Sequence, residues 1–210
     1  MAKMATQFTG QAQVHTDQDY AFNGRTFTDT DYIRLGGAPD GSQVEVTAGD
    51  IGVEIAVANP LFETPAVSVI FQSDTGDAVL YLYKDMFVLK PENYRQGIAS
   101  TSLALQVKHA QALGFAAISL YADGSFSGKL NGYYTWARLG FNMAIPASLL
   151  QRLPGTLQHC QDVLDLMETQ EGRTWWLHEG FGGDMEFDLT PGSRSDRIFT
   201  KYLEEKGIVV

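Results

Sequence analysis

The stretch Met86–Gly114, MFVLKPENYRQGIASTSLALQVKHAQALG, combines an apolar strand, a glycine-containing turn and an amphipathic helix, in that order. The turn, Arg95–Ser100 (RQGIAS), lies directly at the expected start of the helix. The first N–H groups of a helix have no partner within it and attract anions. Gly97 and Ala99 carry little or no side chain, so a ligand can approach this backbone closely. The stretch therefore predicts a cradle for a diphosphate, with an ordinary strand–turn–helix joint as the alternative.

Upstream of this stretch, the sequence predicts an antiparallel meander. Val44–Ala58 alternates in part and contains a break near residue 49, while Ala66–Phe71 is rich in β-forming residues. Ala78–Leu89 is long and apolar, and Asp74–Asp77 (DTGD) before it is typical of a hairpin turn. The meander would deliver its last strand into the glycine turn.

Downstream, a helix is expected over Ile98–Leu113, with Gly114 as its C-terminal stop. Phe115–Tyr121 is a short apolar strand, so the order strand–helix–strand predicts a right-handed parallel crossover. The elements expected next are a loop over Ala122–Leu130, a short helix over Tyr133–Leu139 and a strand over Phe141–Ile145.

The two ends of the chain differ from this middle part. Residues 1–20 are polar and without clear periodicity, which favours a loosely packed arm. Residues beyond 146 favour helices, including a helix-like run over Thr156–Thr169 capped by Thr156 and an amphipathic helix over Ser195–Lys206. We therefore expect three parts: an N-terminal arm and lead-in over 1–43, a core over 44–146, and a C-terminal extension over 147–210 packed on the core.

Composition limits the possible partners. The chain has 210 residues, 44% of them hydrophobic, and a formal net charge of −10 at pH 7. Because phosphate contacts need clustered Lys and Arg, this charge argues against nucleic acid and against an anionic membrane as the main partner. The sequence shows no apolar run of membrane-spanning length and no signal-peptide core at its start, so we expect a cytoplasmic protein. The one cysteine, Cys160, is expected to be a small buried residue.

Two segments of the chain resemble the GNAT superfamily of acyl-CoA N-acyltransferases. Tyr94–Ala99 (YRQGIA) is similar to that superfamily's Arg/Gln-x-x-Gly-x-Gly/Ala turn, although Tyr94 stands where Arg or Gln is usual and Arg95 follows one residue later. Asn131–Phe141 (NGYYTWARLGF) resembles its Asn…Tyr-x-x-Leu-Gly-Phe segment. The resemblance spans roughly Ile51–Met143 and leaves both flanks uncovered.

The resemblance implies an α/β (α+β) fold, with a GNAT-like mixed central sheet, flanking helices and a mainly helical C-terminal extension. It implies acetyl-CoA or another acyl-CoA as co-substrate, and no metal. The backbone of Phe87–Leu89 would pair with the pantetheine arm, and the glycine turn would hold the diphosphate, with charge from Arg95 and from Lys90 or Lys129. The cofactor-binding residues implied are Phe87, Val88, Leu89, Arg95, Gln96, Gly97, Ile98, Ala99, Ser100 and Asn131.

Acyl transfer to an amine also needs an acid that reprotonates the leaving thiolate. The resemblance places this acid at Trp136, whose indole N–H cannot act as a general acid, so we expect the neighbouring Tyr134 to take the role. The alternative is that Tyr133, Tyr134 and Trp136 are packing residues. Asp85 and Glu54 each interrupt an apolar strand and could hold the amine or accept its proton; Asp85 is the candidate base. The alternative places both carboxylates on a solvated face.

The histidines and the tryptophan pair are weaker candidates. The four histidines have no metal-ligand spacing; His109 is expected to be merely exposed, and His178 either lines a substrate pocket or is a surface residue. Trp175 and Trp176 either cover the core or line a pocket. The expected function is acyl-CoA-dependent transfer, of acetyl above all, to an amine of a small molecule or protein. The alternatives are a catalytically silent GNAT-fold binding module and, against the acidic charge, a toxin acting on aminoacyl-tRNA.

Overall fold

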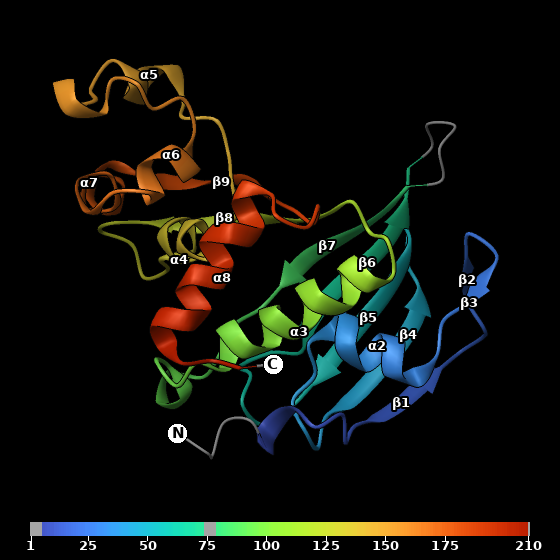
Figure 1. Ribbon diagram of the computed structural model, residues 1–210. Coiled ribbons are helices and arrows are strands. Elements are labelled where there is room, and N and C mark those ends of the chain that lie inside the picture. Colours follow the sequence, from blue (N-terminus) through green and yellow to red (C-terminus); the bar gives the residue numbers. More distant parts are fainter. Residues whose placement is uncertain (1–5, 74–78, 210) are drawn as a thin grey trace. The chain divides into compact units, whose positions relative to one another are not determined.

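The computed structural model describes residues 6–73 and 79–209 (Figure 1). The chain forms two compact units, Met1–Ile118 with Lys206–Val210, and Ser119–Glu205. The expected hairpin turn at Asp74–Asp77 lies outside the described residues. The fold is of mixed α and β class, as the sequence predicted.

The first unit is built on the predicted meander. Its strands run antiparallel in chain order and are β4 (Gln43–Ala48), β5 (Val53–Ala58), β6 (Ala66–Gln72) and β7 (Leu80–Met86). The break expected near residue 49 is the turn between β4 and β5, closed by a hydrogen bond from the Gly49 N–H to the Gly52 carbonyl (2.7 Å). Alternate residues of β4 and β5 are buried, so one face of the sheet carries the core.

The N-terminal segment is more ordered than expected. After the turn η1 (Thr6–Phe8), β1 (Gln13–Thr16) pairs in parallel with β4, which extends the sheet by one strand. The expectation of a loosely packed arm was therefore wrong for these residues. Its apolar content is low, but backbone hydrogen bonds to β4 hold it, a contribution that side-chain periodicity does not report. The short strands β2 (Ala21–Phe22) and β3 (Arg25–Thr26) then form a separate hairpin.

Two helices lie side by side on one face of this sheet, α2 (Asp29–Gly36) and α3 (Ile98–Ala112) (Figure 1). Helix α2 begins at a capping box formed by Thr28 and Asp31. Helix α3 matches its predicted range to within one residue, and most of its small and apolar residues are buried. Two buried side chains of α3 bind the end of α2: Ser102 donates to the Gly37 carbonyl (2.8 Å) and Gln106 donates to the Leu35 carbonyl (2.6 Å).

The second unit combines two strands with several short helices. Strands β8 (Ala117–Ser125) and β9 (Phe181–Asp188) are neighbours in one sheet. The helical elements are α4 (Gly132–Arg138), α5 (Ala147–Leu150), the turn η3 (Gly155–Leu157), α6 (Val163–Met167), α7 (Gln170–Glu179) and α8 (Arg194–Lys206). Helices α4 and α8 agree closely with the sequence predictions.

Three expectations for this unit were wrong. The loop expected over Ala122–Leu130 begins only after Ser125, because β8 continues to that residue. Phe141–Ile145 forms isolated bridges and no strand. The helix expected over Thr156–Thr169 is replaced by η3 and the shorter α6, because Asp162 starts a new helix with its own capping box.

A tryptophan-centred cluster forms the core of the second unit. Trp176 on α7 is fully buried and donates from Nε1 to the Tyr133 carbonyl on α4 (3.1 Å). In return, the Tyr133 hydroxyl donates to the Leu177 carbonyl (2.5 Å). The expectation that the tryptophan pair covers the core is confirmed for Trp176, whereas Trp175 is only half-buried.

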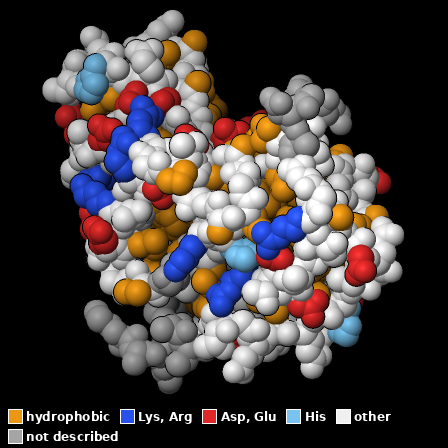
Figure 2. All heavy atoms as spheres, turned by 45° about the vertical axis from the view of Figure 1, so that its right-hand side comes forward, with side chains coloured by type: hydrophobic (Ala, Val, Ile, Leu, Met, Phe, Trp, Pro, Cys, Tyr) orange, Lys and Arg blue, Asp and Glu red, His pale blue; other side chains and the backbone are white. Residues whose placement is uncertain are grey.

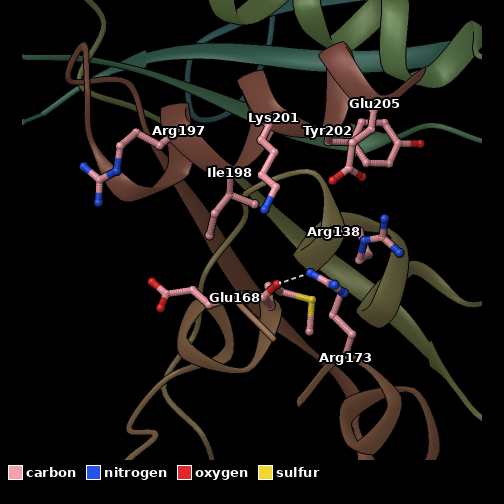
Figure 3. A pocket seen from close by; sticks show the side chains of 9 residues that line it. Arg138, Glu168, Arg173, Arg197, Ile198, Lys201, Tyr202 and Glu205 are labelled. Atoms are coloured by element: carbon pink, nitrogen blue, oxygen red, sulfur yellow. Dashed lines mark hydrogen bonds between the residues drawn. The ribbon is translucent and has the colours of Figure 1, made fainter. Parts of the chain in front are cut away.

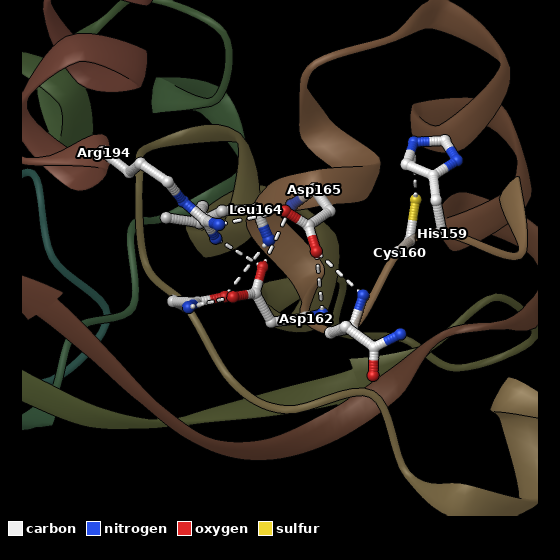
Figure 4. A network of polar contacts seen from close by, with 8 residues as sticks. His159, Cys160, Asp162, Leu164, Asp165 and Arg194 are labelled. Atoms are coloured by element: carbon white, nitrogen blue, oxygen red, sulfur yellow. Dashed lines mark hydrogen bonds and ion pairs between the residues drawn. The ribbon is translucent and has the colours of Figure 1, made fainter.

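A polar network joins α6 to the start of α8 (Figure 4). Arg194 forms ion pairs with Asp162 and Asp165, and Asn142 donates to Asp162 (3.1 Å). Burial alone would raise the pKa of Asp162, but these hydrogen bonds and the charge of Arg194 hold it below its ordinary value. Nearby, Cys160 is fully buried as expected, and burial together with the surrounding carboxylates raises the pKa of its thiol. The thiol is therefore poorly suited to nucleophilic chemistry.

The surface carries mixed charge. On the face drawn in Figure 2, basic side chains lie beside acidic ones, and the described residues do not form one continuous basic surface there. Among the described helices, none combines the length and apolar character needed to cross a membrane.

Candidate functional site

The predicted anion cradle at the start of α3 has an unusual backbone. Arg95 and Gly97 both have positive φ, 59° and 76°, with one residue between them. Gly97 is the N-cap of α3 and, having no side chain, makes no side-chain cap hydrogen bond. A fifteen-residue helix thus directs its positive dipole end, with the Ile98 and Ala99 N–H groups, at this turn. Successive turn residues of this kind form concavities that bind anions.

Two residues of this turn lie at the surface. Arg95 and Gln96 are exposed, and Gln96 donates back to the Glu92 carbonyl (2.7 Å), which braces the turn. Ile98 is buried and anchors the start of the helix in the core. The preceding turn, η2 (Pro91–Asn93), follows β7 after residues 87–90. The sequence-predicted cradle residues are therefore brought together by local chain connectivity.

Residues 87–90 follow the end of β7. One edge of their backbone is hydrogen-bonded to residues 61–63, and the other edge points away from that partner. The Val88 carbonyl accepts from the Glu63 N–H (2.9 Å), and the Lys90 N–H donates to the Leu61 carbonyl (3.0 Å). Phe62 and Leu89 are thus a non-hydrogen-bonded antiparallel pair. In such a pair, the N–H and C=O of Leu89 point to the opposite edge. That edge is where a strand-like ligand backbone could pair, as expected for Phe87–Leu89.

A β-bulge lies just before this segment. Ser68 pairs with Lys84 and Val67 pairs with Met86, so Asp85 has no residue opposite it. The extra residue reverses the alternation of side chains along the strand. As a result, Lys84 and Phe87, three residues apart, lie on the same face, with the Lys84 Nζ 4.5 Å from the Phe87 ring centroid. Asp85 itself is exposed, which agrees with the solvated alternative and leaves its role as a base a proposal.

The sequence analysis missed the charged residue that the strand buries. Lys84 is 4% exposed, and its Nζ donates to Gln106 Oε1 on α3 (2.9 Å). Gln106 in turn donates to the Ser68 hydroxyl (3.3 Å), and both partners are buried. The available signal was the alternation Leu80, Leu82, Lys84, which puts the lysine on the inward face.

Burial lowers the pKa of Lys84 from its ordinary 10.5 to about 7. The cause is the loss of water around the ammonium, which disfavours the charged form. The hydrogen bond to Gln106 and the Phe87 ring compensate only in part, since no carboxylate among the described residues forms an ion pair with Lys84. Near neutral pH this side chain therefore exists in substantial amounts as a neutral amine.

The remaining predicted site residues, Tyr134 and Asn131, belong to the second unit. The Tyr134 ring is half-buried, and its hydroxyl accepts a long hydrogen bond from Arg138 (3.4 Å). Tyr133, by contrast, is buried with its hydroxyl occupied, so it is a structural residue. Trp136 packs edge-on against Phe141, at 5.3 Å between ring centroids. Of the two tyrosines in this helix, Tyr134 is therefore the one whose hydroxyl does not donate to a backbone carbonyl in the hydrogen bonds described.

Two histidines have partners that the sequence did not reveal. His109 was expected to be merely exposed, but its Nε2 lies 2.8 Å from Asp31, which also pairs with Arg25. Burial would raise the pKa of Asp31, yet hydrogen bonds from Thr28 and His109 keep it below its ordinary value. His178 is exposed and packs against the Phe126 ring at 4.4 Å between centroids.

No group of three or more His, Cys, Asp or Glu side chains within 6–73 and 79–209 has an arrangement that could hold a metal ion. Comparison of the chain with protein-family models and with curated proteins finds no match. The site must therefore be interpreted from its own geometry.

Proposed function

We propose that the chain is an acyl-CoA-dependent N-acyltransferase that transfers an acetyl group to an amine. The observation that carries the proposal is the start of α3 at Gly97, where Arg95 and Gly97 have positive φ and the first main-chain N–H groups of the helix could bind an anion. A CoA diphosphate is an anion of suitable size and charge. The outward-facing edge at Leu89 supports it, because a pantetheine arm can pair there as an added strand.

The proposed reaction needs few groups from the protein. The neutral amine attacks the thioester carbonyl, a C–N bond forms, and the C–S bond breaks as CoA leaves as a thiolate. Tyr134 is the proposed donor of the proton that the thiolate takes up, and Asp85 the proposed acceptor of the proton that the amine loses. A main-chain N–H of the β7 segment would polarise the carbonyl. The acceptor amine belongs to a small molecule or a protein.

Thermal unfolding with acetyl-CoA tests the cofactor part of the proposal. A ligand at 100 times its Kd stabilises the native state by about 2.7 kcal/mol, which raises Tm by about 5–10 °C in a chain of this size. Pantetheine, which lacks the diphosphate, is the matched control and should give almost no shift at the same concentration. The absence of a shift with any acyl-CoA would refute the proposal, and an equal shift with pantetheine would refute the role of the turn.

A turnover assay tests the catalytic part. Tyr134→Phe should lower kcat at least tenfold while leaving the acetyl-CoA Kd unchanged, since only the proton donor is removed. Tyr133→Phe is a control for the loss of a hydroxyl that the structure uses in packing. An unchanged kcat in Tyr134→Phe would show that another group supplies the proton.

A second function is favoured by Trp136 in the position that the resemblance gives to the acid, and by the exposure of Asp85. In this alternative the chain is a binding module that retains the cofactor fold without catalysis. Binding of acetyl-CoA with no turnover on a broad panel of amines would favour it over the enzyme.

A further inference from the structure

A pocket of about 210 Å³ lies entirely within the second unit (Figure 3). Residues of four helical segments contribute to it: α4, the end of α6, α7 and α8. The side chains that matter for binding are basic or apolar, and they come from positions more than sixty residues apart in sequence. The lining residues are Arg138, Met167, Glu168, Arg173, Arg197, Ile198, Lys201, Tyr202 and Glu205.

The pocket is basic although the chain is strongly acidic. Four of its lining residues are Arg or Lys and two are Glu, a local formal charge of +2 in a chain of −10. Among the described residues, Arg138, Arg173 and Lys201 form no ion pair with a carboxylate. In Figure 3, Lys201 extends from α8 toward the region where Arg173 and Glu168 lie. Cations left without a carboxylate favour an anionic ligand.

Two of these cations are held in place by the backbone. Arg173 donates to the Met167 carbonyl (2.8 Å), and Arg197 donates to the Gly192 carbonyl (2.6 Å). The Arg138 guanidinium lies between two aromatic rings, 6.0 Å from the centroid of Tyr134 and 5.7 Å from that of Tyr202. Fixed side chains lose little entropy when a ligand binds, so these contacts preorganise the pocket.

One wall of the pocket is apolar. Met167 is 3% exposed, and Ile198 and Tyr202 on α8 are half-buried. Their surfaces can cover an aromatic or aliphatic body, while the cations bind a charged group. The volume is below the roughly 300 Å³ at which pockets for drug-sized ligands begin, so the ligand must be small.

We propose that this pocket binds a small organic anion, with its charged oxygens at Lys201 and Arg173 and its apolar body against Ile198 and Tyr202. Phosphate and carboxylate groups share the chemistry that these cations recognise. The proposal does not depend on the acyltransferase function, because the pocket requires neither acyl-CoA nor an amine.

Calorimetric titration with phenyl phosphate tests the proposal, with benzoate as the carboxylate probe. Lys201→Met removes the charge but keeps the length of an exposed side chain, so the protein should fold normally while the phenyl phosphate Kd rises about tenfold. Lys201→Arg should keep binding within about threefold. Lys108→Met, which removes one charge from the exposed face of α3, should leave the Kd unchanged and so controls for net charge.

Several results would overturn the proposal. No measurable binding of phenyl phosphate or benzoate to the wild-type chain at 5 mM would do so, as would equal affinity in wild type and Lys201→Met. Inorganic phosphate binding as tightly as phenyl phosphate would refute the role of the apolar wall. Preferential binding of benzoate over phenyl phosphate would support it and identify a carboxylate as the ligand.

Discussion

The turn before α3 and the pocket in the second unit are both suited to anions, but different chemical groups form them. The turn offers main-chain N–H groups of consecutive residues. Gly97 has a positive φ, which residues with a β-carbon rarely adopt. The pocket uses the side chains of Arg138, Arg173 and Lys201, which come from three helices. One site therefore depends on local backbone geometry, and the other on how helices pack.

This difference predicts how each site responds to mutation. A site made of backbone groups should be sensitive to the glycine that shapes it and insensitive to the removal of single side chains. A site made of side chains should be sensitive to each charge and to any residue that positions the helices carrying them. Trp176→Ala and Gly97→Ala test these expectations, and Lys84→Met tests the buried lysine of β7. The three predictions follow from the largest expected effect to the smallest.

Trp176→Ala should lower the free energy of unfolding by about 3–5 kcal/mol, because it opens a cavity and removes the donor to the Tyr133 carbonyl. Urea titration measures this loss. Helices α4 and α7 carry two of the pocket cations, so the folded variant should also bind phenyl phosphate more weakly while keeping its acetyl-CoA affinity. The neighbouring half-buried Trp175, changed to Ala, is the control. If Trp175→Ala lowered the free energy of unfolding and the phenyl phosphate affinity as much as Trp176→Ala, the buried packing of Trp176 would not be what holds the pocket.

Lys84→Met should abolish a rise in the free energy of unfolding that the wild-type chain shows between about pH 7 and pH 10.5. Up to pH 10.5 the unfolded chain holds a proton on this lysine, whereas the folded chain releases it near pH 7. The unfolded state therefore binds more protons between these values, and stability rises with pH there. From pH 8 to 9.5 the rise from this group should be about 2 kcal/mol.

The comparison that isolates this effect is the difference between urea unfolding curves at the two pH values. Wild type and the exposed-residue control Lys108→Met should both show the rise, and Lys84→Met should lack it. A rise of equal size in Lys84→Met would show that the buried position does not alter the proton affinity of this amine.

Gly97→Ala should cost about 1 kcal/mol, since a β-carbon is unfavourable at a φ of 76°. It should also weaken acetyl-CoA binding and leave phenyl phosphate binding unchanged. Gly97→Asn is the matched control, because Asn tolerates this conformation better, and it should lie between wild type and Gly97→Ala in both measurements. Loss of phenyl phosphate affinity in Gly97→Ala would show that the two sites are not independent.

The accuracy of the sequence predictions follows the range of the interactions involved. The strands of the meander and the range of α3 are encoded by periodicity and by glycines, and these predictions are confirmed. The helix expected over Thr156–Thr169 was wrong because a capping box at Asp162 competes with continued helix. The N-terminal strand was missed because its hydrogen bonds are made to β4, about thirty residues away.

The predictions for the candidate sites also depend on how far apart in sequence the interacting residues are. That Arg95 to Ser100 form one turn could be predicted from the sequence, because neighbours in a turn are neighbours in space; their role as a binding site stays a prediction. Lys84 could have been found from strand alternation, but its partner Gln106 comes from a helix on the sheet face. His109 and Asp31, 78 positions apart, are paired only by the packing of α2 against α3.

By itself, the sequence determined the meander, the glycine turn and the helix that follows it, because each depends on backbone preferences and apolar periodicity within a few residues. Only the tertiary structure decided that the buried Lys84 is bound by Gln106 of α3, and that four basic side chains of an acidic chain line one pocket. The physical reason is that charge and burial depend on distances between segments, and local sequence does not encode those distances.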